Sequence, residues 1–349
     1  MTYDALLIVS FGGPERREDV IPFLENVLRG KNVPRERLLQ VAEHYYHFGG
    51  RSPINDQNRA LIAALESELK AHGPSLPIYW GNRNWHPMLA DTLRQMQADG
   101  VSRALAFATS AFGSYSGCRQ YLEDIERARV EVGPRAPEIH KLRTFHNHPG
   151  FLTAVAERVR QALEQIEPQR RASASVVFTA HSIPLSMAEA SPYVEQLRES
   201  CRLVCLILGR PAGDLVYQSR SGSPRQPWLE PDICDYIRER NSSGGLEDIV
   251  VVPIGFLSDH MEVIYDLDTE AAALCRDLGV NMIRAATAGV HPAFVSMIRE
   301  LILERTSGQK RRALGTLGPG RDFCNPDCCL LNGMAAGRVG PAAGSSAMA

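Results

Sequence analysis

The chain has 349 residues, 44% of them hydrophobic and 22% charged, a composition typical of globular proteins that excludes disordered and fibrous classes. Its 38 lysines and arginines nearly balance 40 aspartates and glutamates, for a net charge of −2, so no bulk field attracts nucleic acid or an anionic membrane. The N-terminus has no basic segment before an apolar stretch, and no apolar run approaches the ~20 residues of a membrane-spanning helix. We therefore expect a cytoplasmic protein without an integral membrane segment, whose eight cysteines are thiols or metal ligands rather than a disulfide scaffold.

Eight short apolar runs alternate with amphipathic segments along the chain, and each run predicts a β-strand. The segment 55–73 predicts a helix, because Leu61, Leu65 and Leu69 form one stripe and Gly73 ends it. Continuous apolar strands separated by helices favour parallel sheets covered on both faces. The predicted strands are 5–11, 77–82, 103–112, 138–145, 174–182, 214–220, 248–256 and 281–288.

The strands fall into two groups of four, which favours two similar α/β halves over the alternative of one (β/α)₈ barrel. The sequence "HNHPG" (146–150) is the expected boundary between them. We expect a first domain over 1–147, a second over 148–307 and a Gly/Ala/Pro-rich tail over 308–349.

In open α/β sheets the chemistry gathers beyond the carboxyl ends of the strands, and several predicted strands end in unusual residues. The first ends in "FGGPE" after Phe11, and the third runs into "SYSGCRQY", which contains Cys118 and Tyr121. No GxGxxG or GK[ST] phosphate loop and no G-x-S-x-G elbow occurs, which argues against nucleotide binding and serine hydrolysis.

Two strand ends have side chains suited to proton and metal chemistry. The run "VVFTAHSIP" ends in His181, which on its own is more often a structural residue than a functional one. After the seventh strand, Glu262, Asp266 and Glu270 follow one another at intervals of four. Such a row is either a solvated helix face with a capping-box-like start or, on a widened π-type turn, a line of carboxylates that holds cations.

The tail contains "CNPDCC", where Cys324, Cys328 and Cys329 lie within six residues of a segment that is a poor core-former. Dense thiolates hold zinc or iron–sulfur clusters, and the alternative is a flexible tail with incidental thiols. A four-thiolate site needs one more ligand from the folded body. Cys118 is the loop candidate, whereas Cys201 and Cys205 share a helical face and are expected in the core.

The motifs "FTAHSIP", "YQSRSGSPRQPWLEP" and "VPIGFLSDHMEVIYDLD", together with "LLIVSFGGPE" and "HYYHFGGRSPIN", resemble the ferrochelatases, which insert Fe²⁺ into a porphyrin to make haem. The resemblance extends to about residue 305. It implies two Rossmann-like, chelatase-type domains, each with a four-stranded parallel sheet flanked by helices and with the porphyrin between them. It makes His181 and Glu262 the catalytic pair that meets the Fe²⁺ substrate, and it makes Asp266 and Glu270 an outer cation row. Which of the pair takes protons and which presents iron is left open.

The resemblance also implies how the porphyrin is held. Ser52 and Tyr121 match positions that hydrogen-bond porphyrin propionates in bacterial relatives, and Arg29 and Arg51 are near enough in sequence to add charged contacts. Phe11 replaces a tyrosine that in some bacterial relatives ligates the iron from the face opposite the histidine, so ligation from that side is in doubt.

The substrate expected is coproporphyrin III, because the segment 14–34 is rich in basic residues and lacks a long apolar lip. The alternatives are a protoporphyrin IX ferrochelatase, a non-catalytic haem or porphyrin carrier, and a cobalt or nickel chelatase for another tetrapyrrole. The resemblance further implies a [2Fe–2S] cluster on Cys118, Cys324, Cys328 and Cys329, with zinc as the alternative metal. We expect the chain to act as a monomer.

Overall fold

The computed structural model describes residues 2–30, 33–221, 225–325 and 328–331. These residues contain two four-stranded sheets, ordered β2-β1-β3-β4 and β6-β5-β7-β8, with parallel pairing throughout. Each predicted strand is present, and the prediction of two α/β halves is confirmed over the single barrel. The strands are β1 (Ala5–Ser10), β2 (Ile78–Asn82), β3 (Arg103–Ala108), β4 (Glu138–Lys141), β5 (Ser175–His181), β6 (Asp214–Gln218), β7 (Asp248–Val252) and β8 (Asn281–Arg284).

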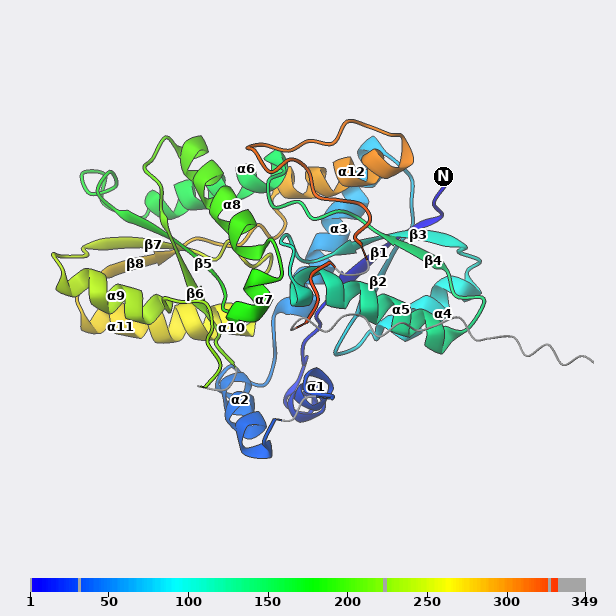
Figure 1. Ribbon diagram of the computed structural model, residues 1–349, viewed down its shortest axis with the longest axis horizontal. Coiled ribbons are helices and arrows are strands. Elements are labelled where there is room, and N and C mark those ends of the chain that lie inside the picture. Colours follow the sequence, from blue (N-terminus) through cyan, green and yellow to red (C-terminus); the bar gives the residue numbers. More distant parts are fainter. Residues whose placement is uncertain (1, 31–32, 222–224, 326–327, 332–349) are drawn as a thin grey trace, which may run out of the picture.

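Helices connect the strands and cover both faces of each sheet (Figure 1). Two of them are π-helices, η2 (Tyr115–Arg119) and η3 (Ile264–Ala271), and η1 (Arg17–Asp19) is a 3₁₀ turn. None of the helices in the described ranges is both long and apolar enough to cross a membrane. The α-helices are α1 (Val20–Val27), α2 (Arg35–His47), α3 (Ile54–His72), α4 (Leu89–Ala98), α5 (Gln120–Val132), α6 (Pro149–Leu163), α7 (Leu185–Glu189), α8 (Tyr193–Leu208), α9 (Ile233–Ser242), α10 (Met261–Val263), α11 (Ala272–Asp277) and α12 (Pro292–Thr306).

The alternation of side chains along the strands produces these layers. In β5, Val176 and Phe178 face a core shared with α6, α8 and α12, whereas Val177 faces a separate core with α9, η3 and α11. The first sheet divides in the same way, with α3 on one face and α4 and α5 on the other. The acidic helix η3 is therefore fixed to the second sheet by its own apolar face.

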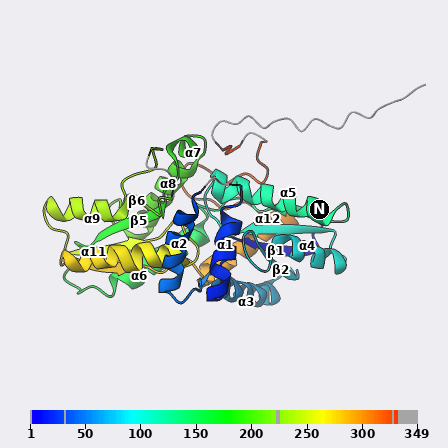
Figure 2. The ribbon, with the colours of Figure 1, turned by 90° about the horizontal axis from the view of Figure 1, so that it is seen from below.

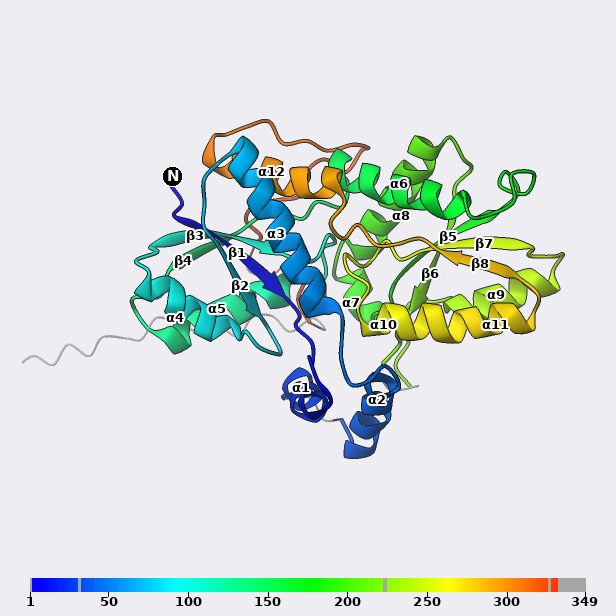
Figure 3. The ribbon, with the colours of Figure 1, turned by 180° about the vertical axis from the view of Figure 1, so that it is seen from behind.

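An aromatic cluster joins the two halves. The rings of Phe107 and Phe145 stack with centroids 5.3 Å apart, and Phe294 of α12 lies 6.2 Å from Phe107. Helix α12 packs against both α6 and α3, so the last helix of the second half lies over the first (Figure 3). The boundary at 146–150 stays a prediction.

Helices α1 and α2 form a hairpin that projects from the body between the two sheets (Figures 1 and 2). It has a small core of its own, in which Phe23 and Leu38 are buried. At its far side, the ring of His44 stacks on Tyr265 of η3, with centroids 3.8 Å apart and planes 7° from parallel. The hairpin therefore belongs to the first half in sequence but also contacts the second.

The chain after α12 runs back across the junction of the two halves. The side-chain amide of Asn147 donates to the carbonyl oxygens of Leu314 and Gly318, at 3.2 and 2.7 Å, and Thr316 N donates to Glu199 Oε1 at 2.7 Å. These contacts fix the course of the segment toward Cys324.

Candidate functional site

His181 is the last residue of β5, and the backbone around it fixes its ring. Its Nδ1 lies 2.5 Å from the carbonyl oxygen of Ser182, and the Tyr193 hydroxyl donates to the His181 carbonyl at 3.1 Å. A carbonyl only accepts, so Nδ1 carries a proton, and in the neutral ring this leaves the lone pair on Nε2. That Nε2 lies 3.8 Å from Glu262 Oε2. The structure thus brings together the histidine and carboxylate predicted as a pair.

Glu262 lies at the start of the acidic helix. His260 caps α10 by accepting a hydrogen bond from Glu262 N at 3.2 Å, and the helix then widens into η3 before it continues as α11. Of the two alternatives for the acidic row, the structure has the π-helical turn. A π-turn aligns residues four or five apart more closely than an α-turn does, so Glu262, Asp266 and Glu270 follow one side of the helix.

Asp266 is held by the end of the neighbouring strand β6. Gln218 Nε2 donates to Asp266 Oδ2 at 3.2 Å and to the Glu262 carbonyl at 3.3 Å, and the Ser219 hydroxyl also donates to Asp266. Burial raises the pKa of Asp266 to about 7, assisted by the charge of Glu262 and opposed by the hydrogen bond from Ser219. Burial also raises the pKa of Glu270. Asp266 therefore changes protonation near neutral pH, as a proton acceptor beside Glu262 requires.

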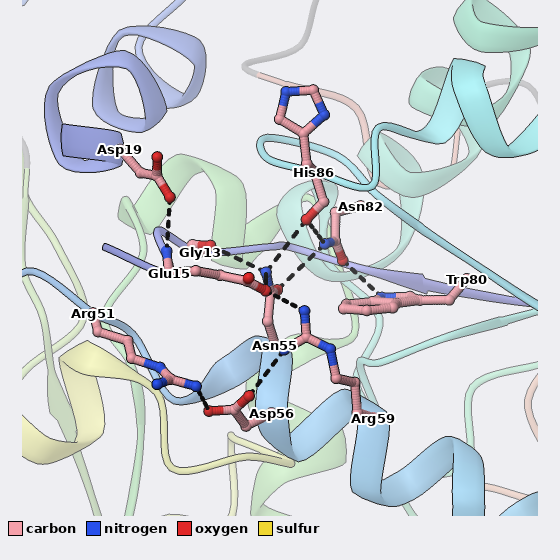
Figure 4. A network of polar contacts seen from close by, with 10 residues as sticks. All are labelled: Gly13, Glu15, Asp19, Arg51, Asn55, Asp56, Arg59, Trp80, Asn82 and His86. Atoms are coloured by element: carbon pink, nitrogen blue, oxygen red, sulfur yellow. Dashed lines mark hydrogen bonds and ion pairs between the residues drawn. The ribbon is translucent and has the colours of Figure 1, made fainter. Parts of the chain in front are cut away.

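A network of polar contacts fixes the loop that follows β1 (Figure 4). Asn55 Nδ2 lies 3.2 Å from the Gly13 carbonyl, 3.0 Å from Glu15 Oε1 and 3.3 Å from the His86 carbonyl. Ser52 is buried directly under Gly13, where an added Cβ would lie 2.8 Å from Ser52 Cβ. The loop and the start of α3 are therefore one rigid unit.

The other residues expected to bind the porphyrin differ in their exposure and in their partners. Arg51 is exposed and pairs with Asp56 (Figure 4), and Arg29 donates to Asn26 Oδ1 at 2.5 Å at the exposed end of α1. Phe11 is 37% exposed. The remaining candidate, Tyr121, is only 5% exposed, with the Arg83 guanidinium 4.5 Å from its ring centroid. Their roles toward a porphyrin stay predictions.

The cysteines of the tail meet the Cys118 loop. Cys118 is buried and accepts a hydrogen bond from Cys324, and the sulfurs of Cys328 and Cys329 are 3.5 Å apart. The bond from Cys324 and the nearby Lys141 ammonium lower the pKa of Cys118 to about 5 in spite of burial.

The four thiols form a continuous series, because Cys324 and Cys329 both contact Cys328. Within the described ranges, no three His, Cys, Asp or Glu side chains are arranged to hold one metal ion. Cys201 and Cys205 are buried in the core beside α6, as expected.

Several residues around the acidic helix escaped the sequence reasoning. Gln218 and Ser219 lie in the motif "YQSRSGSPRQPWLEP", which contributed only to the family resemblance, and its position at a strand end was the available signal. Tyr45 of α2 lies near enough to Glu262 for that charge to help burial raise its pKa. Gln57 and Arg284, whose contacts lie far away in sequence, gave no local signal at all.

Comparisons with known proteins agree closely over almost the whole chain. A family model described as ferrochelatase matches residues 3–306. A ferrochelatase of Rhodopirellula baltica is 60% identical over 329 residues, which cover 94% of this chain and 93% of that protein. Coproporphyrin III ferrochelatases of Nocardia farcinica and Streptomyces coelicolor are 51% and 49% identical, and the matches cover 96% and 94% of this chain and 95% and 93% of theirs.

Among solved structures, SirB from Bacillus subtilis with Fe³⁺ matches with a TM-score of 0.51 at 14% identity, covering 88% of this chain and 98% of that one. At this identity the likeness concerns the fold alone, which is of the chelatase type.

Proposed function

The chain belongs to the ferrochelatase family, and on that premise we propose that it inserts Fe²⁺ into coproporphyrin III, with His181 and Glu262 as the catalytic pair. The observation that carries the assignment of residues is the 3.8 Å separation between His181 Nε2 and Glu262 Oε2 at the head of the acidic helix. A carrier without catalysis has no need of this pair or of the acidic row behind it.

The chemistry follows from what insertion requires. Two pyrrole N–H protons leave the porphyrin while Fe²⁺ sheds its water and enters the ring. The unprotonated Nε2 of His181 accepts a proton or contacts the metal, and Glu262 beside it stabilises the imidazolium that forms. Asp266, which ionises near pH 7, receives a proton from Glu262 and passes it toward Glu270, whereas an entering Fe²⁺ ion travels along the row in the opposite direction.

The preference for coproporphyrin III is supported by the two relatives named for that substrate and by the basic residues of the hairpin region. The side chains of Arg16 and Arg35 are 76% and 72% exposed there, and Arg29 and Arg51 are also exposed. Coproporphyrin has four propionates and protoporphyrin has two, so these cations favour the more highly charged substrate, by roughly 0.2–1 kcal/mol for each exposed contact.

The test is metal insertion by the purified protein, followed through the Soret band under anaerobic conditions with Fe²⁺ and either porphyrin. We expect a higher kcat/KM for coproporphyrin III. A higher kcat/KM for protoporphyrin IX would assign the runner-up substrate, and binding of both without turnover would assign a carrier.

We further propose that Cys118, Cys324, Cys328 and Cys329 hold a [2Fe–2S] cluster. Such a cluster uses four thiolates, two on each iron, and the four cysteines lie in one contacting series that runs from Cys118 through Cys324 and Cys328 to Cys329. Zinc, which four thiolates hold around one ion, is the alternative metal, and metal analysis of the purified protein distinguishes the two. The cluster supplies a metal link between the tail and the Cys118 loop. It has no part in insertion, which transfers no electrons.

We propose domains at 1–147 and 148–307, with 308–349 as the tail, in a chain that acts as a cytoplasmic monomer and a lyase.

A further inference from the structure

The loop that leads into the acidic helix is held from the opposite half of the molecule. Gln57 of α3 receives a hydrogen bond on Oε1 from Asp259 N at 2.8 Å, and its Nε2 lies 3.3 Å from the Asp259 carbonyl oxygen. Both bonds go to the backbone of one residue, so they fix its position and its peptide orientation together. Gln57 lies 202 positions away in sequence.

The side chain of Asp259 is fixed at the same time from a third element. Arg284, at the end of β8, donates to Asp259 Oδ1 at 2.8 Å and to the two oxygens of Asp268 at 2.5 and 3.0 Å. Asp259 is thus held through its backbone by the first half and through its carboxylate by the second. Glu262 follows three residues later, where His260 caps the helix.

We propose that Gln57 is a positioning residue for metal insertion. Its two hydrogen bonds to the Asp259 backbone fix the start of the acidic helix and thereby the distance between Glu262 and His181. The inference rests on the proposed function of that pair. Gln57 touches neither side chain of the pair and acts only through the Asp259 backbone. A misplacement of 1 Å in a catalytic group can lower a rate by about 100-fold.

The expected effect is smaller than that limit, because Arg284 still holds the Asp259 side chain when Gln57 is removed. For Gln57→Ala we expect kcat to fall on the order of tenfold, with no change in porphyrin affinity. Gln57→Glu keeps the oxygen that accepts from Asp259 N but loses the amide that donates to the Asp259 carbonyl. Its kcat should therefore fall less than that of Gln57→Ala. The control is Gln95→Ala, which removes an exposed amide that donates to Asp99 at the end of its own helix, at 2.8 Å.

The experiment measures kcat, porphyrin Kd by fluorescence quenching, and hydrogen exchange at the Asp259 amide in the full chain. Exchange should be faster in Gln57→Ala and near wild type in Gln57→Glu and Gln95→Ala. An unchanged exchange rate, an unchanged kcat, or a weaker Kd that accounts for the whole loss of kcat/KM would overturn the inference. If the wild type itself inserts no metal, the proposed function fails; if it does and Gln57→Ala matches it, only this inference fails.

Discussion

Replacing Asp266 by asparagine should make the protein more stable and less active. Asparagine keeps the shape and, with its oxygen in the place of Asp266 Oδ2, still accepts the hydrogen bonds from Ser219 and Gln218. The substitution removes the negative charge, which destabilises the folded protein because it is buried beside Glu262. The perturbation therefore separates the charge from the packing.

The magnitude follows from the shift in pKa. The pKa of Asp266 is about 7 in the folded protein against 3.8 for an ordinary aspartate, a difference of about 3 units. At 1.36 kcal/mol per unit this is about 4 kcal/mol of unfolding free energy as an upper bound. Because the folded state binds the proton more tightly, the wild type loses stability as pH rises from about 4 to about 7 and regains it as pH falls. Asp266 is partly exposed, so screening by water reduces the expected effect to about 1–3 kcal/mol.

The assay is urea unfolding of the wild type and Asp266→Asn at pH 5 and pH 8. The free energy of unfolding of Asp266→Asn should exceed that of the wild type by more at pH 8 than at pH 5, because the wild-type carboxylate is ionised at pH 8. Asp268→Asn is the control on the same helix: it breaks the ion pair with Arg284, so it should not stabilise. An equal difference between wild type and Asp266→Asn at both pH values would refute the reasoning.

Three other changes test separate parts of the site. Glu262→Gln keeps the shape but removes the charge 3.8 Å from His181, and it should slow insertion by about 100-fold or more, so near-normal turnover would remove Glu262 from the chemistry. Gly13→Ala places a Cβ 2.8 Å from Ser52 Cβ. This overpacking should cost about 1–3 kcal/mol in urea unfolding and raise the porphyrin KM more than it lowers kcat, and an unchanged KM would separate this loop from porphyrin binding. Protein purified without oxygen should be reddish, with about two irons and two labile sulfides per chain. Cys118→Ser should bleach it and Cys205→Ser should not, whereas a colourless preparation with stoichiometric zinc would contradict the cluster.

The sheets were predictable because their signal is local. Apolar runs such as that of β7 are buried on both faces, and their short length and the turn residues at their ends favour a strand over a buried helix. The ends were less accurate: the predicted strand 103–112 stops at Ala108, where Ser110 N turns back to bond the Ala108 carbonyl. A turn of this kind has no apolar signature.

Some features of the site were likewise predictable from local sequence, and others depend on the fold. The interval of four between Glu262, Asp266 and Glu270 was enough to suggest a π-helix, and the structure has one. The contact of Gln57 with Asp259 joins two segments that are 202 residues apart in sequence. A single glutamine forms no periodic pattern, so the contact is visible only in the folded structure. Likewise, the approach of Cys118 to Cys324 depends on the path of the tail across the junction.

The most direct test of the account is anaerobic insertion of Fe²⁺ into coproporphyrin III by the wild type and by His181→Ala. His181 is a strand-end residue whose side chain is 31% exposed, so its removal takes little from the core and the variant should fold normally. The account predicts that the wild type converts the porphyrin spectrum to that of the iron complex, and that folded His181→Ala does not. Near-normal turnover by His181→Ala would contradict it.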